Sequence, residues 1–281
     1  RSSAQQYFHT FCGVLRVLML FVAAVVVIAI LLGKNPMTLF AGLGATSAVL
    51  MLVFKDTITG LAAGVRLTSN DMLHKGDWIT VKSVDANGIV EDMSLTTVKV
   101  RNFDNTIVTI SPTTLVNGSF QNWIGMQKSG GRRVKRVVYF DFRSVRLVDE
   151  TLKRNLLAKH FATEDSFKLK ESLQKAIDKD IQEGKDIEDL KNPAALAPTN
   201  LQLYRKFMEK YLRQRPEVNT DLTLMVRHME ATQCGLPIEF YFFIKDKVWV
   251  NYEHILADIM EHAYALANEF GLKIYEQYPE Q

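Results

Sequence analysis

The chain has 281 residues, with 34 Lys and Arg against 31 Asp and Glu, which gives a formal net charge of +3. An excess this small does not indicate a nucleic-acid-binding protein, and the length suffices for one large or two to three small domains without disulfides or metals. Cys12 and Cys234 lie far apart without metal-ligand spacing, which favours a reducing compartment.

The first apolar segment covers residues 13–33, GVLRVLMLFVAAVVVIAILLG, with Arg16 as its only charged residue. About 20 residues are what an α-helix needs to cross a hydrocarbon core of roughly 30 Å. Arg16 lies one turn from the start, where its side chain can reach the membrane surface. A signal peptide has a shorter apolar region, and a buried core helix shows a polar face. We therefore predict a membrane helix.

A second apolar segment, residues 37–54, MTLFAGLGATSAVLMLVF, follows the short break KNP and carries no charge. It is a second membrane span, joined to the first by a tight hairpin. Lys34 is the only basic residue of that hairpin, whereas the sequence after the second span carries Lys55, Arg66, Lys75 and Lys82. The positive-inside rule therefore places the large C-terminal part in the cytoplasm.

Small residues form a stripe along the second span. Ala41, Gly44, Ala45 and Ala48 recur at spacings of three and four, and Gly60 and Gly64 continue the pattern as a GxxxG. Such a stripe lets another helix approach closely. Ordinary packing within one chain is one explanation. Two spans offer few internal partners, however, so we favour self-association around an axis.

The dipeptide Lys55-Asp56 interrupts this pattern. A straight helix would place two ionisable groups in the membrane at a cost of several kcal/mol. If the helix bends near this dipeptide, both side chains lie at the membrane surface, and residues 57–65 form an amphipathic segment along it. We therefore predict a kink at Lys55 and Asp56.

The region from residue 77 to about 116 contains short β-branched runs, WITV, GIVEDM, TTVKVRN and TIVTIS, separated by Asn-Gly, Asp-Asn and Ser-Pro turn signals. This pattern predicts a small β-barrel or sandwich. A barrel of the Sm type can bind RNA, but aromatic residues are sparse here and no basic-aromatic stacking surface is evident. We expect no nucleic-acid partner.

From residue 129 the order of predicted strands and helices is β-α-β-β-α-β, which is ferredoxin-like. The strands are RRVKRVVYFDF, TDLTLMVRHM, IEFYFFIK and LKIYE, and a helix covers about residues 251–270. Residues 161–199 exceed what that fold needs. We predict an insertion with its own helix, in which Leu169, Leu173 and Ile177 repeat every fourth residue. It is either a solvated flap or a contact between subunits.

His254, Asp258 and His262 share one face of the last helix at spacings that could hold a metal. The adjacent apolar stripe of Ile255, Ile259, Leu266 and Phe270 makes a solvated flank the simpler interpretation. The sequence has no phosphate-binding glycine loop, no Cys/His cluster and no GxSxG motif. We expect neither an enzyme nor a cofactor.

The segment LGATSAVLMLVFKDTITGLAAGV, residues 43–65, resembles the third transmembrane helix of the small-conductance mechanosensitive channel (MscS) family. The similarity continues through GDWITV from residue 76, through residues 88–123, and through GLPIEFYFFIKDKVWVNYEHILADIMEHAYALANEFGLKI at the C-terminus. This last stretch and SGGRRVKRVVYFD from residue 129 are most similar to the miniconductance, YbdG-like branch. The ordered combination is specific, where any single piece is not.

The resemblance implies a homo-heptamer in a bacterial inner membrane, with bent third helices around a pore, cytoplasmic domains that form a vented cage, and lipids as partners. The two hydrophobic constriction positions of the family fall on Ala48 and Leu52, and its kink falls near Lys55 and Asp56. Ser47 and Met51 replace glycines of the best-known member, and Ala48 replaces one of its leucines, so Met51 is a third candidate for the seal. The implied domains are residues 1–66, 67–128 and 129–281.

Two functions are compatible with these features. The first is a channel that opens under bilayer tension and releases ions and small osmolytes on hypoosmotic shock. The second is a membrane-anchored binding or signalling module, in which the two spans only tether the cytoplasmic domains. A tether has no need of the small-residue stripe or the bend, so we favour the channel. The chain begins at Arg1 rather than methionine, which is compatible with further spans before it.

Overall fold

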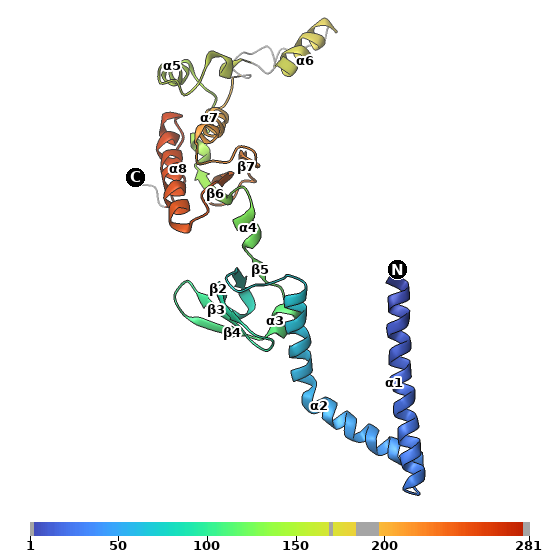
Figure 1. Cartoon of the computed structure of the whole chain (residues 1–281). Helices are drawn as coiled ribbons and strands as arrows, with labels where there is room; N and C mark the ends of the chain where they lie inside the picture. Colours follow the sequence, from blue (N-terminus) through green and yellow to red (C-terminus); the bar gives the residue numbers. More distant parts are fainter. Residues whose placement is uncertain (1–2, 169–170, 184–196, 278–281) are drawn as a thin grey trace. The chain divides into compact units, whose positions relative to one another are not determined.

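The computed structural model describes residues 3–168, 171–183 and 197–277 (Figure 1). The chain forms two compact units, Arg1–Trp123 and Ile124–Gln281. The first unit contains the two apolar helices and a β-sheet, and the second is an α/β unit. Each unit has its own apolar core.

Two long helices open the first unit, α1 (Ser3–Leu31) and α2 (Pro36–Ser69). The predicted KNP break separates them. Gly33 adopts a left-handed conformation with φ of 57° after α1, and the Asn35 side chain caps α2 by accepting the Met37 N–H at 2.9 Å. Pro36 follows at the first helical position, where its missing N–H costs nothing. These residues explain why the chain reverses within so few positions.

The sheet of the first unit has five strands in the order β4-β3-β2-β1-β5, and every pairing is antiparallel. The strands are β1 (Trp78–Val81), β2 (Ala86–Met93), β3 (Val98–Asn102), β4 (Ile107–Ile110) and β5 (Gln121–Asn122). A short helix, α3 (Pro112–Asn117), starts at the predicted Ser-Pro turn, and a single turn, η1 (Lys82–Val84), joins β1 to β2. The four β-branched runs of the sequence are therefore strands, as predicted.

The core of this sheet is completed by helices. Leu67 near the end of α2 and Leu115 of α3 are each 1% exposed and pack with Ile79, Val90 and Val100 of the strands. The C-terminal end of α2 is thus part of the β-domain, whereas its N-terminal end belongs to the apolar hairpin with α1.

The second unit is built on a three-stranded antiparallel sheet of order β6-β8-β7. Its strands are β6 (Arg132–Phe140), β7 (Met225–His228) and β8 (Leu236–Ile244), and its main helices are α7 (Asn200–Gln214) and α8 (Trp249–Glu269). A short helix, α4 (Ile124–Lys128), precedes the sheet. Alternate residues of β8, including Phe240 and Phe242, join a core with Tyr204 of α7 and Ile259 of α8.

The predicted last strand, LKIYE, is reduced to a single bridge between Ile274 and Phe140. Two backbone hydrogen bonds flank the bridge, from Asp141 N to Lys273 O at 2.9 Å and from Tyr275 N to Tyr139 O at 2.8 Å. The bridge lies beside β6, so the order is that of a ferredoxin-like sheet, with its fourth strand shortened.

The predicted insertion follows α5 (Glu150–Ala158). It contains a turn, η3 (Glu164–Phe167), and the helix α6 (Glu171–Gln182), which confirms a helix in this region. Ile177 is buried. Residue 169, residues 184–196 and the side chain of residue 173 lie outside the described part, and so does most of the predicted Leu repeat. One further turn, η2 (Phe142–Ser144), connects β6 to α5.

Candidate functional site

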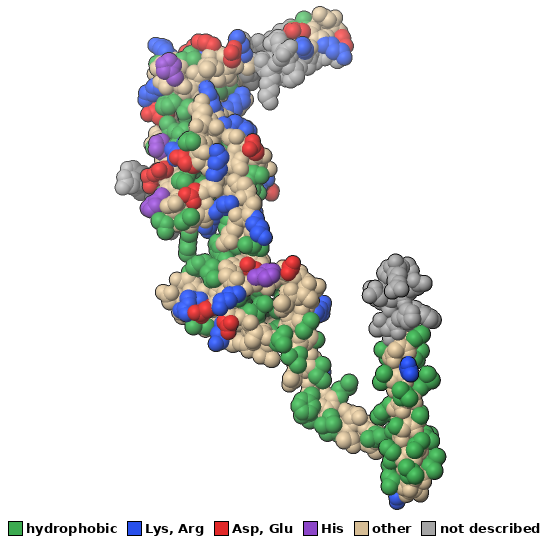
Figure 2. Space-filling view, viewed as in Figure 1, with side chains coloured by type: hydrophobic (Ala, Val, Ile, Leu, Met, Phe, Trp, Pro, Cys, Tyr) green, Lys and Arg blue, Asp and Glu red, His purple; other side chains and the backbone are tan. Residues whose placement is uncertain are grey.

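The membrane half of α2 is almost bare within its own chain. None of the side chains in its most apolar 18-residue window is buried, and α1 shows 11% burial in the corresponding window. Figure 2 shows hydrophobic side chains over both helices with few charges between them. Apolar surfaces of this size are covered in native proteins by lipid or by another protein. Both helices are long and apolar enough to cross a membrane.

The predicted stripe occupies one side of this helix. At 100° per residue, the positions from 41 to 52 that carry it fall within roughly 100° of one another. All of them are exposed, and a Cβ built at Gly44 would have no neighbour within 4 Å. The members of the stripe are Ala41, Gly44, Ala45, Ala48 and Leu52. The structure therefore leaves this face open to a second helix.

The three predicted constriction residues lie on the same uncovered surface. Leu52 is 75% exposed and Met51 is 72% exposed, and Ala48 one turn earlier is also exposed. Met51 lies about 100° around the helix from Leu52, at the edge of the stripe. No described side chain of this unit covers any of the three. Their role at a constriction depends on neighbouring subunits and stays a prediction.

Lys55 and Asp56 lie within one continuous helical hydrogen-bond pattern from Pro36 to Ser69. They are the only ionisable residues between Lys34 and Arg66. The Thr59 hydroxyl donates to the Lys55 carbonyl at 2.8 Å, a type of bond that often bends helices. Figure 1 shows that α2 changes direction between its two ends. The assignment of the kink to Lys55 and Asp56 stays a prediction.

A cleft of about 490 Å³ lies beside the helix at this level. Asp56, Thr57, Thr59 and Gly60 line it from α2, and the opposite wall comes from the β-domain at Thr96, Ser111, Pro112 and Thr113. Threonine and serine residues line part of this cleft, unlike the bare apolar helix that precedes it.

The two glycines of the GxxxG have different surroundings. Gly60 is half-buried and has open space where a Cβ would lie. Gly64 is buried, and a Cβ there would overlap the carbonyl oxygen of Leu95 in the β2–β3 loop. On a straight helix both glycines lie more than about 100° from the Ala48 face. The contact with Leu95 explains the glycine at 64 without a second subunit.

A polar joint holds the end of α2 on the sheet. The carboxylate of Asp77, which is 7% exposed, accepts the His74 backbone N–H at 3.1 Å and the Asn122 side-chain amide at 2.8 Å. The same Asn122 amide donates to the Met72 carbonyl at 3.3 Å. Buried polar groups that satisfy one another in this way make a rigid connection. Sequence reasoning missed this joint, because Asp77 and Asn122 are distant in the chain.

The candidate metal residues of α8 lie on its exposed face. His254, Asp258 and His262 are exposed, while Ile259 of the same helix is fully buried, which confirms the solvated flank. Nδ1 of His262 lies 2.7 Å from the Asp258 backbone carbonyl oxygen. Across the described residues no group of three or more His, Cys, Asp or Glu could hold a metal ion.

Comparison with known proteins places this geometry in context. Residues 56–125 match the family model described as "Mechanosensitive ion channel, beta-domain". The match begins at Asp56, covers the end of α2 and includes all five strands of the first sheet. The matched family consists of channels, not enzymes.

Two relatives come from Methanocaldococcus jannaschii. The small-conductance mechanosensitive channel MscMJ is 33% identical over 90 residues, which cover 32% of this chain and 25% of that protein. The large-conductance mechanosensitive channel MscMJLR is 29% identical over 149 residues, which cover 53% of this chain and 40% of that protein. The chain thus matches less than half of the length of these relatives.

Solved structures share the fold. The closed-state crystal structure of Helicobacter pylori MscS has a TM-score of 0.54 at 14% identity, covering 96% of this chain and 81% of that chain. The cryo-EM structure of Arabidopsis thaliana MSL1 has a TM-score of 0.58 at 11% identity, covering 98% of this chain and 79% of that chain. At these identities the likeness concerns the fold: two membrane-length helices, a β-domain and an α/β domain.

Proposed function

We propose that this chain is a member of the MscS family of mechanosensitive channels and forms one subunit of an ion channel that opens when the membrane is stretched. The observation that carries the proposal is the division of α2 into two halves. Its first half is apolar and uncovered in its own chain, and its second half is built into the β-domain. A pore-lining helix fixed to a cytoplasmic domain requires this arrangement.

The proposed pore forms when several copies of α2 meet along the stripe. Small residues at 41, 44, 45 and 48 allow close approach, and Leu52 with Met51 then narrows the opening. A narrow apolar ring excludes water and stops ion flow. Tension does work in proportion to the in-plane area gained, so it favours a state with spread helices in which the ring widens and wets.

The stripe carries no ionisable residue before Lys55, so the pore should select weakly between ions. Lys55 and Asp56 are proposed to lie at the membrane surface, where the helix bends and its polar groups stay hydrated. Gly60 is proposed as the last contact position between neighbouring helices. Beyond it, Gly64 is occupied by its own β-domain.

The resemblance of the sequence to MscS-family channels implies the number of subunits, the branch of the family and the membrane. We propose a homo-heptamer of the miniconductance, YbdG-like branch in a bacterial inner membrane, with both soluble domains in the cytoplasm. Its role is to release ions and small osmolytes on hypoosmotic shock. Homo-oligomer formation is supported by the bare stripe, because each copy presents the same uncovered face.

The test is patch-clamp recording under graded suction, in a membrane that lacks other mechanosensitive channels. Wild type is compared with Leu52→Ser, and Leu50→Ser serves as the matched control. Position 50 lies about 160° around the helix from position 52, so it faces away from the stripe. We expect tension-dependent unitary currents, a lower opening tension for Leu52→Ser, and unchanged gating for Leu50→Ser.

Other outcomes decide against the proposal. Identical currents in all three proteins would remove Leu52 from the constriction. Silence from all three, with the assembled protein present in the membrane, would favour a membrane-anchored binding or signalling module.

A further inference from the structure

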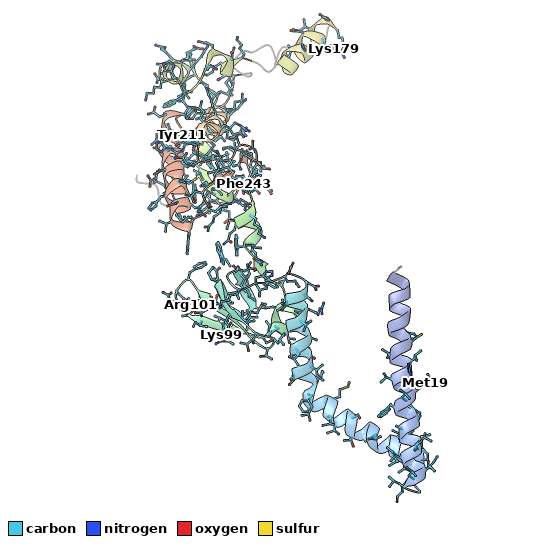
Figure 3. All side chains as sticks on the ribbon, viewed as in Figure 1. Met19, Lys99, Arg101, Lys179, Tyr211 and Phe243 are labelled. Carbon is cyan, nitrogen blue, oxygen red and sulfur yellow. The ribbon has the colours of Figure 1, made fainter. Side chains whose placement is uncertain are left out.

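A cavity of about 250 Å³ lies in the second unit, away from the membrane helices in sequence. One wall is the segment 160–166 between α5 and η3, and the other wall is α7. Figure 3 labels Tyr211 on this helix. Neither the pore proposal nor any sequence motif accounts for this cavity.

Two lysines and a histidine line the cavity. Lys206 and Lys210 lie one turn apart on α7, and His160 lies on the opposite wall. Both lysines are exposed, and within the described part of the chain neither side chain has an ion pair or a hydrogen bond. No described Asp or Glu lines the cavity. Two like charges at this spacing repel each other, so the empty cavity favours an anion.

Among the residues that the structure describes, the carboxylates next to this region have other partners. Glu164 lies 3.8 Å from Lys153, and Asp165 lies 2.7 Å from Lys168. Lys168 lowers the pKa of Asp165, which keeps that carboxylate ionised and paired. Glu269 of α8 lies 2.5 Å from Lys159. The lysines of this region therefore divide into those with carboxylate partners and the two of the cavity.

The floor of the cavity is aromatic. The rings of Phe161 and Phe207 meet edge to face with centroids 5.2 Å apart, and both are half-buried, so part of each ring faces the cavity. Tyr211 is held in place from outside the cavity, since its ring stacks on His262 at 5.8 Å and its hydroxyl accepts from Arg215 at 3.3 Å. Hydroxyl groups of Thr163 and Ser166 complete the polar wall.

We propose that this cavity binds a small organic phosphate. The phosphate lies between Lys206, Lys210 and His160, and its carbon part rests on Phe161 and Phe207. A phosphate dianion balances two lysines, whereas a carboxylate leaves one uncompensated, and lysine is a common phosphate-binding residue. The volume lies below the range of roughly 300–1,000 Å³ usual for ligand pockets, so it fits a phosphomonoester with one ring. This inference does not depend on channel activity.

The test is isothermal titration calorimetry, in which phenyl phosphate is titrated into the purified full chain in maltoside detergent and a phosphate-free buffer. Wild type is compared with Lys206→Gln/Lys210→Gln. The control is Lys75→Gln/Lys99→Gln, which removes the same charge at exposed lysines of the first unit; Figure 3 labels Lys99 on β3. We expect the cavity variant to bind at least about tenfold more weakly, because two charge-assisted contacts are lost, and the control to match wild type.

Three further probes separate the contributions of the phosphate charge, the aromatic ring and lipid acyl chains. Inorganic phosphate tests the cations alone, and benzyl alcohol tests the ring alone; both should bind more weakly than phenyl phosphate. Dihexanoyl phosphatidic acid, titrated in the same way, distinguishes a lipid headgroup from a soluble ligand, because its acyl chains exceed the cavity. Tighter binding of this lipid would overturn the soluble-ligand assignment.

Two outcomes remove the site altogether. One is the same affinity for phenyl phosphate in the cavity variant and in wild type. The other is no binding to wild type up to the millimolar range. Neither bears on tension gating, so failure here and failure of the proposed channel are separate results.

Discussion

Gly64 of α2 packs against the backbone of Leu95 so closely that no side chain fits between them. Leu95 lies in the loop between β2 and β3, which belongs to the β-domain. The contact thus joins the candidate pore helix to the β-domain, and the atoms of Leu95 nearest to Gly64 belong to its backbone. Leu67, one turn further, is buried in the core of the same domain. A movement of this end of the helix must carry the β-domain with it.

The first prediction concerns this contact. Gly64→Ala forces the helix away from Leu95, and overpacking of this kind costs about 1–3 kcal/mol. Gly42→Ala is the control, since a Cβ there has open space. Native-state hydrogen exchange of the β2 and β3 amides in the full chain measures the effect. Unchanged protection in Gly64→Ala would show that the loop at Leu95 yields without cost.

The second prediction concerns ion selectivity. The wild-type pore should give a reversal potential near zero in a salt gradient, because the stripe before Lys55 has no charge. Ala48→Glu should shift the potential toward cation selectivity and Ala48→Lys toward anion selectivity, since a ring of like charges at a constriction selects counter-ions. The opposite signs serve as an internal control. Equal potentials in both variants would place Ala48 away from the ion path.

The third prediction concerns the buried carboxylate of β8. Glu239 is fully buried, Arg227 donates to it at 2.5 Å, and Lys135 lies 3.6 Å from its other oxygen. Arg227→Ala leaves a poorly compensated buried charge and should cost about 3 kcal/mol.

The exposed pair of Arg101 and Glu91, 2.6 Å apart, is the comparison for this effect. Arg101→Ala should cost less than about 1 kcal/mol, because water replaces the lost partner. Hydrogen exchange of the β8 amides measures the effect of Arg227→Ala, and exchange of the β3 amides measures the effect of Arg101→Ala. Similar losses in both variants would contradict the role given to burial.

The fourth prediction concerns Tyr204, which is fully buried and donates a 2.6 Å hydrogen bond to the Ala263 carbonyl of α8. Tyr204→Phe removes this bond between α7 and α8 and should cost about 1 kcal/mol. Tyr264→Phe, at an exposed position, should cost nothing measurable. Hydrogen exchange of the α8 amides distinguishes the two variants. No difference between them would mean that packing alone holds α7 on α8.

The same residue gives a pH dependence. Burial raises the pKa of Tyr204 in the folded state, so the neutral hydroxyl is favoured there. Its contribution to stability is complete below the unfolded value of about 10 and is lost as the pH rises above it, because the unfolded chain ionises first. Above about pH 10 the free energy of unfolding should therefore decrease less steeply with rising pH in Tyr204→Phe than in wild type. Superimposable pH profiles would exclude this tyrosine from the alkaline transition.

Regular local patterns predicted most of the fold. Both apolar helices, the break at KNP and the β-branched strands follow from periodicity and turn residues, which act over a few neighbouring positions. The predicted length of the last strand was too great, because the length of a strand depends on how much of the neighbouring edge, here that of β6, it can pair with. The stripe of Ala41, Gly44, Ala45 and Ala48 was visible at once, since helical spacing alone places these residues on one face.

The sequence by itself determined three properties: that the chain enters a membrane, at which residues the helical hairpin turns, and which face of α2 carries small residues. Composition and spacing set these properties directly. Only the tertiary structure decided which glycine serves which contact. Gly60 and Gly64 are equivalent in the sequence pattern, but Leu95 fills the space beside one and leaves the other open. It also brought Lys206 and Lys210 opposite His160, which is about fifty residues away in the chain. Contacts between distant residues arise from packing of whole elements, and no local pattern records them.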